Sequence, residues 1–211
     1  CCRADRLCRP ARPRDPGFPL PATATAHVLL PPAGHPLLTA WWLETALAPA
    51  LRRHRADVLL ALDGTVPFRT RVAGLPVVHD LAFEHFPEHL GFAKRRFWRT
   101  YVRASVRRAA RVAAISEFSR RDLVATYGLA PDAIEVTPCG VDEDLRPLSS
   151  AEQGEIRRRY SGGAEYYLHV GAIQPRKNVA NLLRAFDRFK RSSGCDSKLL
   201  LAGRLAWKYR E

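Results

Sequence analysis

The strongest constraint on the fold of this 211-residue chain is an alternation of short apolar runs with segments of helical periodicity. Apolar runs of four to six residues, the length of a buried strand, occur at 57–62, 75–79, 112–115, 134–137, 166–170 and 198–202. Apolar residues repeat at helical spacing most clearly in 39–54, 93–110, 116–127 and 178–189. Strands that alternate with helices predict the α/β class with parallel sheets.

The composition allows a packed core and leaves the chain strongly basic. Hydrophobic residues make up 46%, no run reaches the ~20 apolar residues of a membrane span, and the net charge is +13. Such a charge attracts nucleic acid, anionic lipid or phosphorylated substrates. Of the 34 basic residues only five are Lys, so a bias toward Arg in the coding composition is an alternative origin of the charge.

The cysteines predict a reducing environment. The five cysteines are scattered, form no CxxC pair and show no zinc-ligand spacing, which favours free thiols. The first residues are rich in Arg and lack the apolar core of a signal peptide. We therefore expect a cytoplasmic protein, with peripheral contact at the inner face of the membrane as an open alternative.

The chain is expected to hold one domain and the start of another. We interpret residues 1–26 as an irregular leader or a sequence artefact, 27–145 as the first domain, 146–165 as a junction and 166–211 as the start of a second domain. Because one strand, one helix and one strand cannot form a domain, and because the chain contains no Met, we expect it to be part of a longer protein.

Four loops follow strands and are candidate ligand sites, because ligands of parallel sheets bind at the carboxyl ends of the strands. They contain His79 with Asp80, Ser116 with Glu117, residues 139–142, and residues 171–178. His79 could hydrogen-bond a sugar or a phosphate, or it could simply stabilise its own loop. The acidic run 142–144 has a DxD form, which we interpret as part of a linker; no metal site is expected.

The loop at 171–178 contains the clearest candidates for residues that bind a ligand. Gly171 would allow a ligand to approach the backbone, and Arg176 and Lys177 precede a helix that begins near Asn178. Two cations beside a helix N-terminus suit a diphosphate group. An ordinary surface loop with solvated charges is the alternative, and neither GxGxxG nor GxxxxGK[ST] is present.

A basic helix is expected at 94–111, which contains eight basic and no acidic residues. Like charges stacked at i, i+4 spacing weaken a helix slightly, so the pattern needs an explanation. Three interpretations are open: the basic residues form a solvated face, they contact anionic lipid, or they bind an anionic acceptor.

Five motifs together resemble bacterial glycosyltransferases of family 4, within the GT-B superfamily. They are VVHDLAFEHFPEHL, RVAAISEFSRRDLVATYG, IEVTPCGVD, YYLHVGAIQPRKNVANLLRAFDRFK and LLLAGRLAWKY, and they span roughly residues 27–211. The resemblance implies two Rossmann-like domains facing across a cleft. It also implies a nucleotide-sugar donor, a glycan or lipid-linked acceptor, retention of the anomeric configuration and no metal or other cofactor.

The resemblance also suggests roles for single residues. His79 matches the histidine of the family's HD motif near the transferred sugar, and Ser116 matches a serine at a strand end. Gly140 and Asp142 match the crossover between the domains, although Cys139 replaces the usual Asn there.

On the donor side, Gly171 matches the glycine at the diphosphate and Lys177 the lysine that holds it. Arg176 could replace the Arg that often follows that glycine, because Ala172 stands there. The family's Glu-x7-Glu pair would lie beyond Glu211, so we expect the chain to be inactive alone. Alternatives are another GT-B enzyme, such as a sugar-nucleotide epimerase or glycan synthase, and a basic nucleic-acid-binding protein, although no specific nucleic-acid motif is present.

Overall fold

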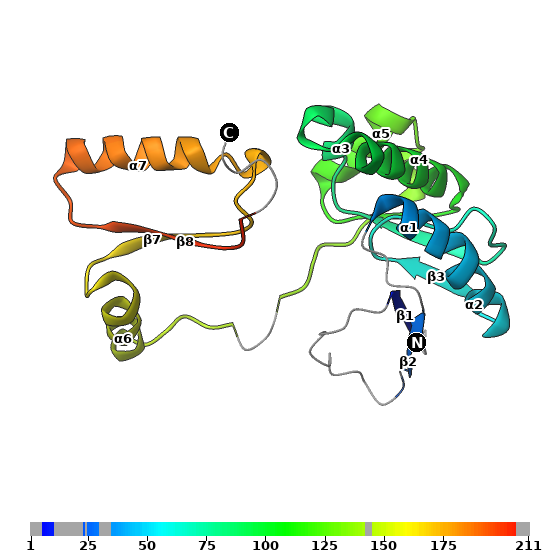
Figure 1. Ribbon diagram of the computed structural model, residues 1–211, viewed down its shortest axis with the longest axis horizontal. Helices are drawn as coiled ribbons and strands as arrows, with labels where there is room; N and C mark the ends of the chain where they lie inside the picture. The colour runs from blue at the N-terminus through cyan, green and yellow to red at the C-terminus, as the bar shows by residue number, and fades with distance from the viewer. Residues whose placement is uncertain (1–5, 11–22, 24, 30–34, 142–144, 206–211) are drawn as a thin grey trace. The chain divides into compact units, whose positions relative to one another are not determined.

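The computed structural model describes residues 6–10, 23, 25–29, 35–141 and 145–205 (Figure 1). The chain forms two compact units, Cys1–Cys139 and Gly140–Glu211, and each is described by itself. We expected a junction over 146–165, and the helix found within that range belongs to the second unit.

The first unit contains a parallel sheet of four strands. Its order is β3 (Val58–Ala61), β4 (Ala73–Val78), β5 (Val112–Ala114) and β6 (Ile134–Val136), so neighbours in the sheet are also neighbours in the chain. All three residues of β5 are buried, as expected for a central strand of a covered parallel sheet. The α/β class predicted from the alternation is confirmed.

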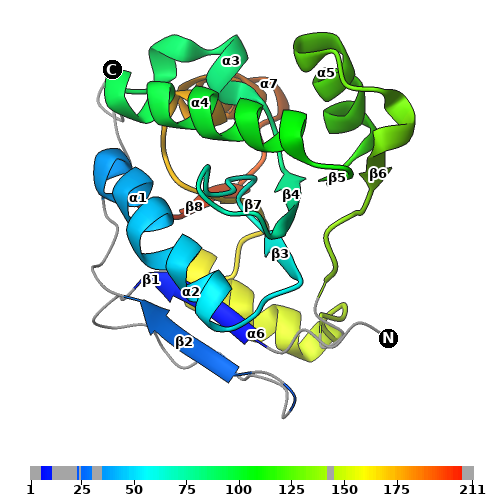
Figure 2. The ribbon, with the colours of Figure 1, turned by 90° about the vertical axis from the view of Figure 1, so that its right-hand side faces the viewer.

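Helix α4 (Phe92–Arg108) joins the two apolar clusters of this unit. Its residues Val102 and Val106 pack with strand β5 and with Leu123 of α5 (Glu117–Tyr127). Its residues Phe97 and Tyr101 pack instead with the first long helical segment of the chain. Figures 1 and 2 show α4 together with α5 and the short α3 (Ala82–His85) on one side of the sheet.

That first helical segment contains a π-helical turn ahead of a proline. It comprises α1 (Pro36–Trp42), η1 (Leu43–Leu47) and α2 (Ala48–Arg53), with Pro49 at the start of α2. Proline lacks an N–H and its ring collides with the carbonyl four residues earlier, so the wider π turn lets the helix continue. A proline at this position predicts a kink in the helix, and the structure accommodates Pro49 through this wider turn.

The caps of α5 differ in detail from the sequence pattern. Ser116 is the N-cap, and its hydroxyl oxygen accepts a hydrogen bond from Ser119 N at 3.1 Å. From the sequence, Ser116 or Ser119 is expected to cap this helix, with Ser119 and Asp122 as a capping box. That box is wrong, because Asp122 bonds His85 and Thr126. Gly128 ends the helix in the left-handed conformation at φ 67°, as predicted. Short 3-10 turns flank this region at η2 (Pro87–His89) and η3 (Pro131–Ala133).

The amino-terminal segment differs from the expectation for residues 1–26. Strand β1 (Arg6–Pro10) pairs in parallel with β2 (Thr25–Leu29), so the irregular structure that we expected is not found at Arg6–Pro10. A strand ladder is made by backbone groups, and the five residues of β1 lack the apolar pattern on which the sequence prediction relied. The Trp42 indole Nε1 donates to the Leu29 carbonyl at 3.2 Å, which ties β2 to α1.

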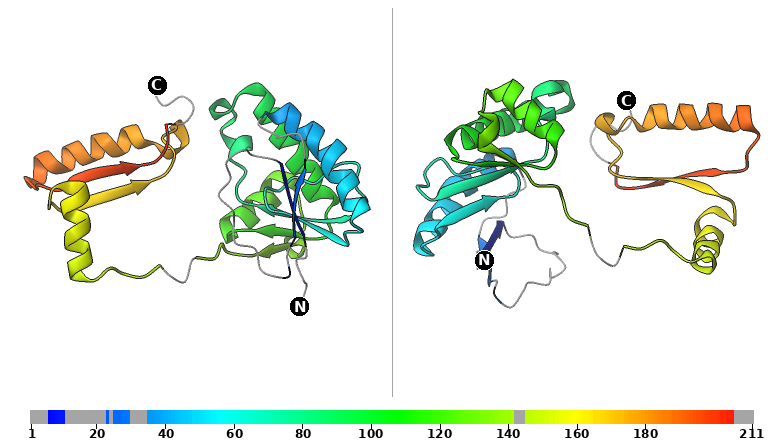
Figure 3. Two further views of the ribbon diagram at one scale, coloured as in Figure 1. Left: turned by 60° about the horizontal axis from the view of Figure 1, so that its bottom comes forward. Right: turned by 180° about the vertical axis from the view of Figure 1, so that it is seen from behind.

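The second unit begins with one helix, which is followed along the chain by a strand, a second helix and a second strand. Strands β7 (Tyr166–Val170) and β8 (Lys198–Ala202) pair in parallel with the bounds that the sequence predicts. Between them lie η4 (Pro175–Lys177) and α7 (Val179–Ser193), and α7 runs along the strands in Figures 1 and 3. The ring of Tyr167 on β7 contacts the rings of Phe186 and Phe189 on α7 at interplanar angles of 67° and 82°.

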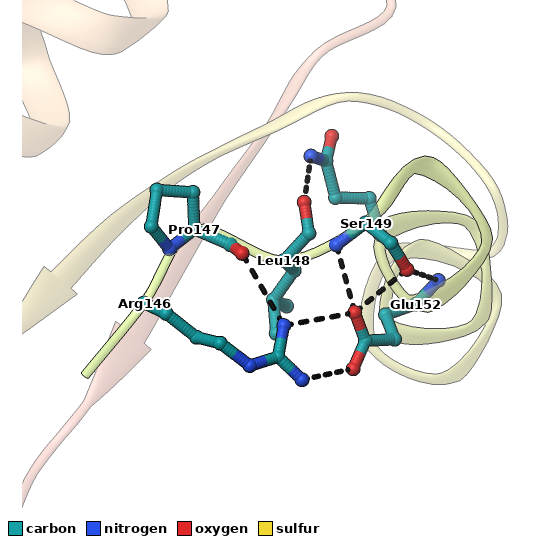
Figure 4. Close-up of polar contacts among 6 residues, drawn as sticks. Arg146, Pro147, Leu148, Ser149 and Glu152 are labelled. Carbon is teal, nitrogen blue, oxygen red and sulfur yellow. Dashed lines mark hydrogen bonds and ion pairs between the residues drawn. The ribbon is translucent and has the colours of Figure 1, made fainter. Parts of the chain in front are cut away.

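Helix α6 (Ser150–Ser161) opens this unit with a complete capping box (Figure 4). The Glu152 carboxylate accepts from Ser149 N at 2.7 Å, and Glu152 N donates to the Ser149 hydroxyl at 3.4 Å. Arg146 donates to the same carboxylate at 2.9 and 3.3 Å. The Arg146 guanidinium first, and then Ser149, lower the pKa of Glu152 from 4.5 to about 2.

This cap predicts a pH-dependent stability of α6. A lowered folded-state pKa stabilises the folded state above the ordinary value near 4.5, and that stabilisation disappears as the pH falls through about 2. Glu152→Gln should therefore lower the melting temperature at neutral pH, and the difference from the wild type should vanish near pH 2. Melting followed by far-ultraviolet circular dichroism measures this effect. Glu155→Gln, an exposed change on the same helix, is the control, and equal melting of both variants at neutral pH would contradict the prediction.

Candidate functional site

The carboxyl ends of two adjacent strands of the first unit, β3 and β4, meet at His79. His79 follows β4, and its Nε2 lies 2.9 Å from the carbonyl oxygen of Leu62, just after β3. Because a carbonyl only accepts, Nε2 carries the proton in this hydrogen bond, and Nδ1 is the ring nitrogen that Leu62 does not engage. The Ser119 hydroxyl on α5 donates to the His79 carbonyl at 2.8 Å. His79 therefore links the ends of β3 and β4 to helix α5 while it stays exposed.

The loop after His79 is held by its own turn and by α5. Asp80 Oδ1 accepts from Ala82 N at 3.0 Å, which starts α3. At the end of α3, His85 Nε2 lies 2.8 and 2.9 Å from the two carboxylate oxygens of Asp122. These contacts fix the turn that carries His79 and Asp80.

The carboxylate of Glu84 also links α3 to both α5 and α4. Glu84 accepts from the Tyr127 hydroxyl at 3.0 Å and pairs with Arg99 at 2.6 Å. Burial, followed by the charge of Glu84, raises the pKa of the Tyr127 phenol well above its usual value. Tyr127 thus stays a neutral donor to Glu84 across the ordinary pH range.

The other predicted residues of this unit are less closely gathered. Ser116 is half-buried, and its hydroxyl lies 3.1 Å from that of Ser119, so it joins the His79 network. Glu117 is exposed and pairs with Arg120 at 3.4 Å, with no described contact to His79. Gly140 is exposed, and a Cβ there would meet nothing within 4 Å. Asp142 lies outside the described residues.

In the second unit, the ends of β7 and β8 are in close backbone contact. Gly171 N donates to the Ala202 carbonyl at 2.9 Å, and Ile173 N donates to the Arg204 carbonyl at 3.0 Å. A Cβ at Gly203 would overlap the Gly171 carbonyl, so only glycine fits at position 203. The sequence analysis missed Gly203, because its need for a small residue comes from the neighbouring strand.

Lys177 and α7 lie beside this strand end. A Cβ placed on Gly171 would lie 4.0 Å from Lys177 Cε, so the lysine stem passes over the glycine. Asn178 is left-handed at φ 53°, a conformation that Asn tolerates better than most residues, and α7 begins directly after it. Asn178 occupies the N-cap position but makes no side-chain cap bond, so its predicted capping is correct in position only. The first N–H groups of α7 have no carbonyl partner within the helix.

Two buried polar atoms near this loop have no hydrogen-bond partner among the residues described. They are His169 Nε2 and Gln174 Oε1. His169 Nε2 lies 3.6 Å from the place of a Cβ on Gly171, on the side of the predicted phosphate loop. A buried unpaired polar atom costs stability unless something binds it. A ligand could bond His169 Nε2 as a donor or an acceptor, whereas Gln174 Oε1 can only accept. His169 is half-buried in β7, and the sequence alone cannot show that its Nε2 lacks a partner.

The basic helix of the sequence analysis is α4, and its outer face lines a groove of about 590 Å³. Five arginines of α4 line the groove together with Glu84 and Phe92. The helix ends at Arg108, so the expected arginine stripe does not include Arg111, which bonds the Asp132 carbonyl instead. Within the described ranges, no helix is long and apolar enough to cross a membrane, and no three His, Cys, Asp or Glu gather as metal ligands.

Comparison with known proteins gives two findings. The model of the family described as Glycosyltransferase Family 4 matches residues 6–145. The chain is also 25% identical over 175 residues to O-antigen chain mannosyltransferase B of Escherichia coli, over 82% of this chain and 44% of that protein. The chain therefore spans less than half the length of this relative. The family match begins within the segment 1–26 that we expected to lie upstream of the domain.

The hydrogen bond from Ser119 to His79 predicts a specific loss of stability. Ser119 is only 4% exposed and its bond to the His79 carbonyl is partly buried, so Ser119→Ala should cost about 1 kcal/mol. Urea unfolding followed by fluorescence of Trp42 and Trp98, which both lie in the first unit, measures the change. Ser150→Ala, at the exposed start of α6, is the control and should cost less than about 0.5 kcal/mol. Equal unfolding free energies for the two variants would disprove the role of Ser119.

Proposed function

Because this chain belongs to glycosyltransferase family 4, we propose that the complete protein transfers a sugar from a nucleoside diphosphate to an acceptor hydroxyl group. The acceptor would be a glycan or a lipid-linked saccharide, and the anomeric configuration would be retained. Two Rossmann-like domains of GT-B type would face each other, with the second unit of this chain on the donor side. No metal or other cofactor is included in this proposal.

The observation that carries the proposal is the arrangement of Gly171, Lys177 and the start of α7. Gly171 has no side chain, the Lys177 stem lies 4.0 Å from its Cβ position, and the N-terminus of α7 follows directly. Positive charge and aligned N–H donors suit a diphosphate. The unpaired His169 Nε2 offers a further hydrogen bond at the same strand end. Arg176 is exposed beside Lys177 and would add a second cation.

In the transfer step, the bond between the anomeric carbon and the diphosphate oxygen breaks while the acceptor oxygen bonds to that carbon. The acceptor proton passes to the leaving diphosphate. Lys177, Arg176 and the α7 N-terminus would stabilise the negative charge that grows on the leaving group. His79 would position the sugar through Nδ1, because Nε2 is already bonded to Leu62.

The sugar and the location are proposed from the relative and from the charge. The E. coli relative is named a mannosyltransferase, so a mannose donor is the first to test. We also propose a cytoplasmic protein with peripheral contact to an anionic membrane through α4, which would bring the acceptor side close to lipid-linked saccharides.

The diphosphate role of Lys177 is testable in the full-length protein. Lys177→Ala should lower the rate of transfer on the order of 10²–10³-fold, because a cation is removed from the place where charge develops. The measurement is release of nucleoside diphosphate from a panel of nucleotide sugars that includes a mannose donor, with and without acceptor extract. Lys190→Ala, near the far end of α7, removes the same charge away from the loop and should leave the rate within about twofold.

The outcomes separate the alternatives. An unchanged rate in Lys177→Ala would refute the diphosphate assignment. Conversion of the nucleotide sugar without transfer to any acceptor would favour a sugar-nucleotide epimerase instead.

A further inference from the structure

The outer face of α4 carries a concentrated positive charge. Its groove is lined by Arg95, Arg96, Arg99, Arg103 and Arg107. Glu84 is the single carboxylate among the lining residues, and Arg99 and Tyr127 already bond it. Most of this positive charge is thus left to attract an anionic partner.

The neighbouring helix α1 exposes large apolar side chains. Leu37 is 68% exposed, Leu38 48% and Trp41 53%. Residues 37 and 41 are one helical turn apart, and 38 lies beside them, so the three form one stripe. The buried side of the same helical segment consists of Trp42, Leu43 and Leu47, so α1 is apolar on both its inner and its outer side.

The apolar stripe of α1 and the arginine face of α4 belong to packed, adjacent helices. The Tyr101 hydroxyl of α4 donates to Glu44 at 3.2 Å and contacts the Ala40 carbonyl at 3.4 Å. Leu37 and Trp41 precede these two contact residues by three positions each, so they flank the line along which α1 meets α4. Phe92, 72% exposed at the start of α4, adds another apolar group at the groove.

We propose that α1 and α4 together form a docking surface for an anionic phospholipid bilayer, in which Leu37, Leu38, Trp41 and Phe92 enter the interface and the α4 arginines bind headgroup phosphates. The proposal rests on the peripheral membrane contact proposed above and adds the apolar helix that anchors it. It does not require the transfer reaction.

The mixture of side chains favours lipid over nucleic acid. Aliphatic leucines cannot stack on bases, whereas an acyl interface accepts them, and tryptophan is favoured at the boundary between headgroups and acyl chains. Arginine stems can lie along apolar surface while the guanidinium groups reach phosphates. An apolar stripe beside a basic stripe is the pattern of helices that lie in the membrane interface.

Co-sedimentation of the 211-residue chain with sucrose-loaded vesicles tests this surface. We expect binding to phosphatidylcholine vesicles that contain roughly one third phosphatidylglycerol, and weak or no binding to pure phosphatidylcholine. The fluorescence of Trp41 should shift to shorter wavelength on binding, and Trp41→Phe should remove most of that shift while binding persists.

Two double variants separate the two halves of the surface. Arg103→Glu with Arg107→Glu should weaken binding roughly tenfold or more, and Leu37→Ser with Trp41→Ser should weaken it on the order of tenfold. The charge-matched control is Arg52→Glu with Arg53→Glu, at the exposed end of α2, and the apolar control is Phe118→Ser, 70% exposed on α5. Circular dichroism verifies that each variant is folded.

Each outcome tests a different part of the proposed docking surface. If the arginine variant loses binding while the Leu37 and Trp41 variant binds like the wild type, the apolar anchor is wrong and only a charge contact remains. Equal recovery with both kinds of vesicle overturns the docking surface. Tight binding to an RNA oligonucleotide without vesicle binding would assign the patch to nucleic acid. None of these results bears on the transfer assay with Lys177→Ala.

Discussion

The burial of one side of α4 is the interaction on which the first unit depends. Val102 and Val106 pack into the sheet cluster, and Phe97 and Tyr101 pack into the cluster of the first helical segment. A single helix therefore joins the sheet to α1 and α2. Because its inner side is packed against both clusters, five of its arginines lie on the outer side, where they line the groove with Glu84. Arg108 instead bonds the carbonyls of Phe68 and Thr70. The same packing presents α1 beside α4, which turns an apolar stripe and a basic stripe into one surface.

Hydrogen bonds at the strand ends of the first unit fix the position of His79. His79 is bonded through its ring to the end of β3 and through its carbonyl to Ser119 of α5. The turn after it is held by Asp80 and by the pair of His85 with Asp122. An exposed histidine is thereby held in place at the edge of the sheet. The second unit uses a different device, close backbone contact between Gly171 and Gly203, to bring the Lys177 loop to a strand end.

Much of this fold follows from local patterns. Apolar runs located the strands β3 to β8, and the bounds of β7 and β8 were predicted to the residue. Strand β1 was missed because its five residues have little apolar pattern, and strands pair through their backbone groups. The capping box assigned to Ser119 and Asp122 was wrong, because the sequence could not show that Asp122 bonds His85 from another helix. The apolar face of α1 at Leu37 and Trp41 also escaped prediction, since periodicity indicates an amphipathic helix but not a helix with two apolar sides.

The sequence by itself determined the α/β class, the strand-end loops and the residues of the candidate donor loop, because strand and helix periods and glycine or cation positions are local properties of the chain. The family resemblance rests on the same local motifs, and the match over 6–145 supports it. Tertiary structure alone decided which nitrogen of His79 is engaged, why position 203 must be glycine, and that His169 is left without a partner among the described residues. Each of these depends on atoms from distant parts of the chain meeting in space, and no local pattern of residues encodes such a meeting.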